Sequence, residues 1–307
     1  MESIEDVVEK WNLYSTAYAT ETEPSTVQSA VSLYNITSWH KVDRILDAGC
    51  GPGLGIQSLV STLMKKNAKV YWIDIAEKML EIFEQRFTTN DYGKNGDNVF
   101  KTIKEEDIKS IEDIELLESQ SGIKNDGKGV FLMLSNTEKL AFPDDWFDAY
   151  TSNLCLQITP NHMSMLKECY RVLKPDSKAA FTVWGREENC SFITLIPEIL
   201  EKYGIKEKPW KYWDFHLNNT EQTIKDMKSV GFKHVKYYYF PTNHAILNGE
   251  QMWHFIVSTP NKYVIEEFDE ETQDKIKTDI IDTFEERYGQ HSPHMVSFET
   301  MIFLCVK

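Results

Sequence analysis

The sequence predicts an α/β fold built on a doubly wound, mostly parallel sheet of seven strands, with helical lid insertions. Strand-like and helix-like segments alternate five times between residues 42 and 184, the order that produces a parallel sheet. A further helix near 220–230 and two more strand-like segments follow, and the second of these is the apolar run at 300–307. This order predicts helices on both faces of one sheet.

Composition limits the class of protein. The 307 residues suffice for one large domain with insertions, and the 41% hydrophobic and 26% charged content is that of a globular protein. The acidic N-terminus resembles no targeting signal, and no apolar run approaches the roughly 20 residues that span a bilayer. Five scattered cysteines without a Cys-x-x-Cys pair favour a reduced, cytoplasmic protein with no metal site. The net charge of −15 disfavours nucleic acid and fits a neutral or cationic small molecule.

Residues 1–40 are expected to form a helical cap. Trp11, Tyr14 and Tyr18 recur at about helical spacing, which indicates an amphipathic helix. The pattern breaks at residues 20–24 and a second helix is expected beyond the break. The periodicity alone leaves open whether these helices pack on the sheet edge or over a ligand site.

The first strand, at 42–47, leads into a glycine-rich turn and a helix at 56–65. A strand, a glycine turn and a helix start form a nucleotide-cofactor cradle in open α/β sheets. A dinucleotide fingerprint requires Gly-x-Gly-x-x-Gly, and the third glycine is missing whether the count starts at Gly49 or at Gly51. A nicotinamide-dependent dehydrogenase is therefore disfavoured.

What remains is Asp-x-Gly-x-Gly-x-Gly, and the stretch LDAGCGPG at 46–53 resembles the first motif of the class I S-adenosylmethionine-dependent methyltransferases. The resemblance covers roughly residues 40–240 and the last strand. It implies a Rossmann-like methyltransferase domain over 41–307, with insertions at 88–128, 186–219 and 244–294. It also implies S-adenosyl-L-methionine as cofactor, approached by the backbone of the turn and covered by tyrosines of the cap. The residues so implicated are Gly49, Cys50, Gly51, Gly53, Tyr14 and Tyr18.

The second strand, 69–74, ends on Asp74. An acidic side chain at this position can accept hydrogen bonds from both ribose hydroxyls, as in the related dinucleotide fold. Taken alone, Asp74 would also suit a helix N-cap. The resemblance implies that Ile75 and Met79 of the following turn contact the adenine.

Residues 88–128 are longer than the family's usual connection and are expected to be a surface insertion. They begin with a polar loop at 90–97 and include a short acidic amphipathic helix at 108–117. The third strand, 130–134, is followed by Asn136 and Thr137. Relatives commonly carry aspartate at the position of Asn136, where it accepts from the adenine amino group; an amide oxygen can accept that bond without charge.

The fourth strand, 146–153, ends at Asn153 and Leu154, where the resemblance implies that the transferable methyl points. Gln157 occupies a position at which many relatives have histidine. A helix at 163–173 and a fifth strand at 179–184 complete the common core.

Two stretches outside the common core, 186–219 and 244–294, are interpreted as lid or substrate-binding elements. The first is rich in aromatic residues and includes Trp210, Tyr212 and Trp213. The second contains a helix near 270–288, expected to be capped by Asp269 and to bury one apolar face.

The sequence singles out no one residue as the catalytic base. His162, His216, His244 and His254 are each candidates for a base acting on an oxygen acceptor. The function expected is methyl transfer to a small-molecule acceptor by in-line displacement. The alternative is a non-catalytic member of the fold that acts in binding or assembly.

Overall fold

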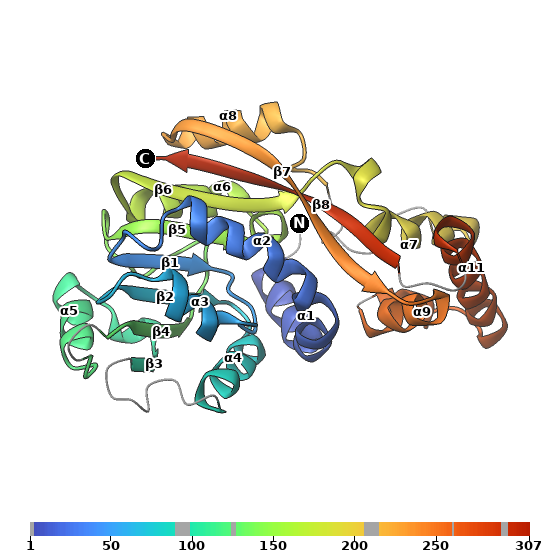
Figure 1. Ribbon diagram of the computed structural model, residues 1–307, viewed down its shortest axis with the longest axis horizontal. Coiled ribbons are helices and arrows are strands. Elements are labelled where there is room, and N and C mark those ends of the chain that lie inside the picture. Colours follow the sequence, from blue (N-terminus) through green and yellow to red (C-terminus); the bar gives the residue numbers. More distant parts are fainter. Residues whose placement is uncertain (1–2, 90–98, 124–126, 206–214, 260, 290–293) are drawn as a thin grey trace.

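An eight-stranded sheet in the order β3-β4-β2-β1-β5-β6-β8-β7 forms the centre of the molecule (Figure 1). The computed structural model describes residues 3–89, 99–123, 127–205, 215–259, 261–289 and 294–307. Neighbours from β3 to β6 pair in parallel, whereas β8 runs antiparallel to both β6 and β7. The strands are β1 Arg44–Ala48, β2 Lys69–Asp74, β3 Val99–Ile103, β4 Gly129–Leu134, β5 Phe147–Asn153, β6 Leu173–Trp184, β7 Lys233–Ile246 and β8 His294–Val306.

The fold class is confirmed, and the strand count of seven is wrong. The additional strand is β3, which pairs with β4 at the sheet edge and lies within the stretch expected to be an insertion. Only Ile103 of its five residues is buried, and Thr102 is exposed, so the alternation that marks a half-buried strand is weak. The loop expected at 90–97 lies outside the described residues.

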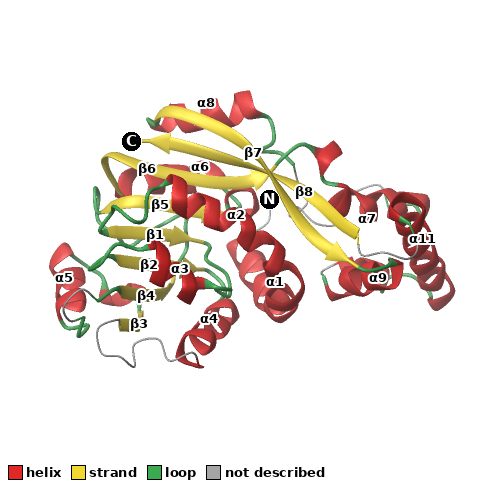
Figure 2. Ribbon diagram, viewed as in Figure 1, coloured by secondary structure: helices red, strands yellow, loops and turns green. Residues whose placement is uncertain are grey.

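Helices cover both faces of the sheet (Figure 2). Odd and even residues of the parallel strands point to opposite faces, so Ile45 packs in one apolar cluster and Leu46 in the other. The helices of at least eight residues are α1 Ile4–Ala17, α2 Glu23–Ile36, α3 Ile56–Leu63, α4 Glu77–Thr89, α5 Ile111–Ser119, α6 His162–Val172, α7 Ser191–Lys202, α8 Thr220–Val230, α9 Gly249–Ser258 and α11 Glu270–Tyr288; α10, Asn261–Ile265, is a single short turn.

The helical backbone continues through residues 20–24, where the sequence pattern predicted a break. A π-helical turn, Tyr18–Thr22, joins α1 to α2, and Pro24 lies in the first turn of α2, where its missing N–H is not needed. Ser3 and Asp6 form a capping box that starts α1. α1 lies beyond the carboxyl ends of the central strands, whereas α2 runs across one face of the sheet and packs on β5 and β6 (Figure 1).

β7 and β8 extend beyond the other strands, and the two stretches expected to be lids meet at their far end (Figure 2). There α7, α9 and α11 share one apolar cluster, in which Ile276, Ile280 and Phe284 are fully buried. The Asp269 side chain accepts from the Thr272 N–H, so the expected cap of α11 is confirmed. Trp210, Tyr212 and Trp213 lie outside the described residues. No described helix combines the length and apolar character needed to cross a membrane.

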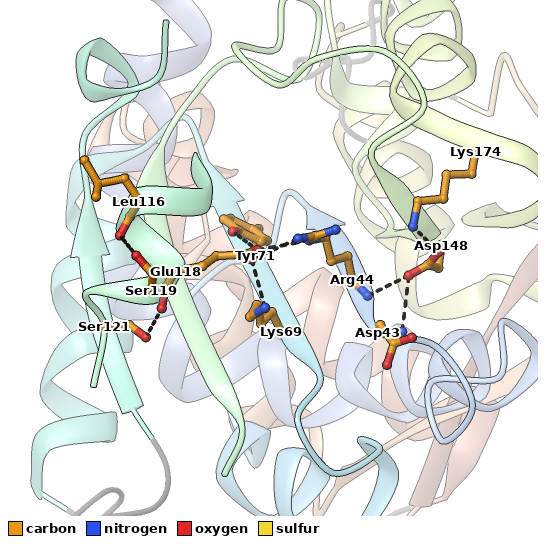
Figure 3. A network of polar contacts seen from close by, with 10 residues as sticks. All are labelled: Asp43, Arg44, Lys69, Tyr71, Leu116, Glu118, Ser119, Ser121, Asp148 and Lys174. Carbon is orange, nitrogen blue, oxygen red and sulfur yellow. Dashed lines mark hydrogen bonds and ion pairs between the residues drawn. The ribbon is translucent and has the colours of Figure 1, made fainter. Parts of the chain in front are cut away.

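The amino ends of β1 and β2 are tied to α5 by a buried carboxylate (Figure 3). Glu118 accepts two hydrogen bonds from Arg44, at 3.0 and 3.1 Å, one from Tyr71 at 2.7 Å, and pairs with Lys69 at 2.8 Å. Burial acts to raise the pKa of Glu118, but these cationic and hydroxyl donors outweigh it and the pKa is lowered. The acidic helix of residues 111–119 is therefore anchored to the sheet, at the end opposite the glycine turn.

Candidate functional site

The glycine turn after β1 has a backbone that only glycine adopts easily. Gly49, Gly51, Gly53 and Gly55 have φ values of 75°, 60°, 75° and 71°. A Cβ on Gly49 would lie 2.5 Å from the Cys155 sulfur, and one on Gly53 would lie 2.4 Å from the Phe83 ring. The turn therefore needs glycine for both conformation and space, and its bare backbone is open to a ligand.

Asp74 lies at the carboxyl end of β2, facing this turn. Its carboxylate accepts from the Gly51 N–H and the Ala76 N–H, each at 2.9 Å. Burial raises the pKa of Asp74, and the backbone N–H donors partly offset that rise. Each carboxylate oxygen has a second lone pair, so the group can still accept from a ligand hydroxyl.

Asp47, the acidic residue of the glycine motif, is buried at the base of the glycine turn. It accepts from the Thr151 hydroxyl at 2.6 Å, the Trp72 indole at 2.8 Å and the Tyr34 hydroxyl at 2.9 Å. Burial raises its pKa to about 6, against the opposing effect of these three hydrogen bonds. Its carboxylate links β1 to β2, β5 and α2 beneath the turn.

Asn136 follows β4 and forms a local turn. Its Oδ1 accepts from the Glu138 N–H at 2.8 Å, which fixes the orientation of the amide. Thr137 beside it is buried, and both residues line the same cleft as Asp74.

Asn153, at the end of β5, is held from two sides. Its Oδ1 accepts from the Ser29 and Thr182 hydroxyls, both at 2.7 Å, and its Nδ2 donates to the Thr26 carbonyl at 3.1 Å. Leu154 next to it has a φ of 53°, an unusual conformation for a residue with a side chain. Two of these three partners, the Thr26 carbonyl and the Ser29 hydroxyl, belong to α2 and were not among the predicted site residues, because a backbone carbonyl or a lone serine in a helix carries no sequence signal for such a role.

These groups meet in two adjoining hollows. The larger one is covered by Ile4, Val7 and Trp11 of α1 and reaches from Asn136 past Asp74 to Leu154. The smaller one lies between α2 and the glycine turn. The predicted residues on their walls are Tyr18, Gly49, Cys50, Gly51, Gly53, Asp74, Ile75, Met79, Asn136, Thr137, Asn153 and Leu154. Tyr14 instead lines a groove on the other side of α1, with its hydroxyl 2.6 Å from that of Thr22.

The walls of both hollows are acidic. Asp74 and Glu138 line the larger hollow, Glu23 and Asp47 line the smaller, and the described lining residues include no lysine or arginine. Such a site favours a cation over an anion. Among the described residues, no group of histidines, cysteines and carboxylates is arranged to hold a metal ion.

The structure brings none of the candidate histidines to these described walls. His162 pairs with Asp226 at 3.5 Å and its ring lies 5.8 Å from that of His216, between α6 and the segment leading to α8. His254 is exposed on α9. His244 hydrogen-bonds to the Ser25 hydroxyl of α2, and burial lowers its pKa.

Comparison with known proteins agrees with this geometry. Residues 46–181 match the sequence profile of a family described as a methyltransferase domain. The ubiquinone/menaquinone biosynthesis C-methyltransferase UbiE of Vibrio vulnificus is 28% identical over 120 residues, which is 36% of this chain and 46% of that one. The demethylmenaquinone methyltransferase of Symbiobacterium thermophilum is 24% identical over 222 residues, 66% of this chain and 72% of that one. The chain thus spans less than half the length of the first of these relatives.

Solved structures agree at the level of the fold. Phosphoethanolamine N-methyltransferase 2 of Haemonchus contortus, in complex with phosphomonomethylethanolamine and S-adenosylhomocysteine, has a TM-score of 0.53 at 15% identity and covers 100% of this chain and 60% of its own. The [4+2]-cyclase SpnF has a TM-score of 0.54 at 14% identity, with 100% and 97% covered. The fold and the glycine-turn site define a Rossmann-like class I domain. Residues 46–181 match a methyltransferase domain, and this match together with the curated relatives supports a class I S-adenosylmethionine-dependent methyltransferase.

Proposed function

We propose that this protein binds S-adenosylmethionine in the two adjoining hollows and transfers its methyl group to a small-molecule acceptor. The observation that carries the proposal is the convergence of the glycine turn, Asp74, Asn136 and Asn153 on one cleft, from the carboxyl ends of four parallel strands. Ligands bind at this edge in open α/β sheets.

The residues present suit the cofactor in their charge and in the placement of their polar groups. Asp74 would accept from the ribose hydroxyls, and Asn136, Ile75 and Met79 would surround the adenine. The turn's bare backbone and the smaller hollow would receive the methionine portion. The acidic walls suit a ligand that carries a sulfonium and an ammonium group.

The cofactor supplies an already activated methyl group, so the protein's part is chiefly to position the acceptor. Asn153 and Leu154 form a rigid wall beside the turn, held by α2 and β6. The described walls offer no histidine as base, which favours an acceptor that loses its proton without one, such as an amine. The same walls favour a neutral or cationic acceptor over an anionic one.

The relatives support methyl transfer to small molecules in general, since two are quinone-pathway methyltransferases by name. All five cysteines are free thiols, which supports a reducing compartment such as the cytoplasm.

Turnover with methyl-labelled cofactor tests the activity. We expect label to appear in at least one member of a panel of amines, phenols and activated carbon acids, with S-adenosylhomocysteine formed in equal amount. Binding of the cofactor without any turnover, together with a stoichiometric partner on purification, would instead favour the alternative, a non-catalytic subunit. The observation that motivates this alternative is the uncharged Asn136 at the position where relatives commonly carry aspartate.

A further inference from the structure

Glu23 and Arg86 form an enclosed ion pair between α2 and α4. Arg86 Nη1 lies 2.6 Å from Glu23 Oε2, and the two side chains are 27% and 7% exposed. Neither residue belongs to the sequence motifs of the site. Charged groups removed from water need hydrogen-bond partners to compensate the lost hydration. The partners of Glu23 and Arg86 therefore show which segments this ion pair connects.

The pair is bonded to both sides of the cleft. Glu23 Oε1 accepts from the Leu54 N–H at 2.7 Å, and Arg86 donates to the Pro52 carbonyl at 2.8 Å; both are backbone groups of the glycine turn. Arg86 also donates to the Ala19 carbonyl at 3.1 Å, in the π-helical turn that carries Tyr18. This one ion pair therefore connects α2 and the π-helical turn to the glycine turn.

The turn needs such support because its glycines have no side chains with which to hold it. At one end the Asp74 carboxylate accepts from the Gly51 N–H. At the other end Gly53 lies against Phe83, which is three residues before Arg86 and on the same side of α4. The smaller hollow lies between these two attachments, and Glu23 lines it together with Tyr18.

We propose that Glu23 and Arg86 are positioning residues that hold the glycine turn and Tyr18 in the arrangement that receives the amino-acid end of the cofactor. This inference rests on the proposed function. It means that the N-terminal helices and the glycine turn stabilise each other. A change that makes one of them more mobile should therefore make the other more mobile and lower the affinity for the cofactor.

The test compares Arg86→Met with Arg44→Met. The Arg44–Glu118 pair is a close match, because its side chains are 24% and 6% exposed and its contact is 3.0 Å, yet it lies at the opposite end of the sheet. The readouts are the affinity for S-adenosylhomocysteine by calorimetry and amide hydrogen exchange of the ligand-free protein. We expect Arg86→Met to weaken binding at least tenfold and to speed exchange in residues 4–22 and 49–56 together. Arg44→Met should lower the melting temperature while leaving the affinity within twofold of wild type.

Arg86→Lys and Glu23→Gln carry the same test if Arg86→Met does not fold, since each keeps part of the hydrogen bonding. They should weaken binding to an intermediate extent, and the lysine variant should recover part of the exchange protection. Unchanged affinity in the Arg86 and Glu23 variants, or an equal loss in Arg44→Met, would overturn the inference while leaving the proposed function intact. Failure of the wild-type protein to bind S-adenosylhomocysteine would overturn the proposed function itself, and this inference with it.

Discussion

Replacing Asp47 by asparagine should remove a pH dependence from the stability of the protein. The carboxylate is 3% exposed and receives its hydrogen bonds from three neutral donors, on Thr151, Trp72 and Tyr34. No cation among the described residues pairs with it, and burial raises its pKa from 3.8 to about 6. The charged form is therefore disfavoured in the folded protein relative to the unfolded chain.

The magnitude follows from these two pKa values. Between pH 3.8 and about 6 the native state binds this proton and the unfolded chain releases it, so the free energy of unfolding falls as the pH rises. At roughly 1.4 kcal/mol per pH unit, Asp47 lowers the stability by about 3 kcal/mol across this window. Above about pH 6 both states are ionised and the contribution is constant.

Asparagine preserves the shape and most of the bonding. Its oxygen can accept from Tyr34 and Trp72, and its amide group can donate to the Thr151 hydroxyl. We therefore expect Asp47→Asn to match wild type near pH 4 and to exceed it by up to about 3 kcal/mol at pH 7.

Urea unfolding followed by circular dichroism, at intervals from pH 4 to pH 8, measures both proteins. Other groups titrate in the same range, so the difference between the two curves is the informative quantity. A difference that does not change with pH would refute the raised pKa of Asp47. A variant less stable than wild type at every pH would show that the charge is needed for the fold.

Three further substitutions test other parts of the structure. Gly53→Ala should destabilise the fold by about 2 kcal/mol more than Gly55→Ala in denaturant unfolding, because both glycines have positive φ but only the first faces a ring at 2.4 Å; equal losses would contradict the crowding. Glu118→Gln should cost about 3 kcal/mol by leaving two cations without their carboxylate, with cofactor affinity unchanged in calorimetry; a loss below about 1 kcal/mol would show that the network is dispensable. Asn136→Asp should tighten S-adenosylhomocysteine binding severalfold, since a charged acceptor makes the stronger hydrogen bond; weaker binding would place the adenine elsewhere.

The regular elements of the core were predictable because their patterns are local. The residues of β2 and the bounds of α8 and α11 follow from a continuous apolar run and from helical periodicity with a capping residue. β3 was not predictable, because a short edge strand with little burial has almost no pattern to detect.

The parts of the site that a local sequence motif defines were predictable. The parts that depend on hydrogen bonds between residues far apart in the sequence were not. The glycine turn and Asp74 are set by their neighbours in sequence. The bond from Ser29 of α2 to Asn153 joins residues 124 positions apart, and the pair between Glu23 and Arg86 joins residues 63 positions apart. Such contacts depend on how the N-terminal helices cross the sheet, which periodicity does not specify.

Calorimetric titration of the wild-type protein and of Asp74→Ala with S-adenosylhomocysteine tests the central claim most directly. Asp74 lines the cleft and holds the glycine turn through the Gly51 N–H. We predict saturable binding to wild type and at least a tenfold weaker affinity in the variant, equivalent to about 1.4 kcal/mol or more for a lost charge-assisted bond pair. Absence of binding to wild type at millimolar ligand, or equal affinity in the two proteins, would contradict the assignment of this cleft to the cofactor.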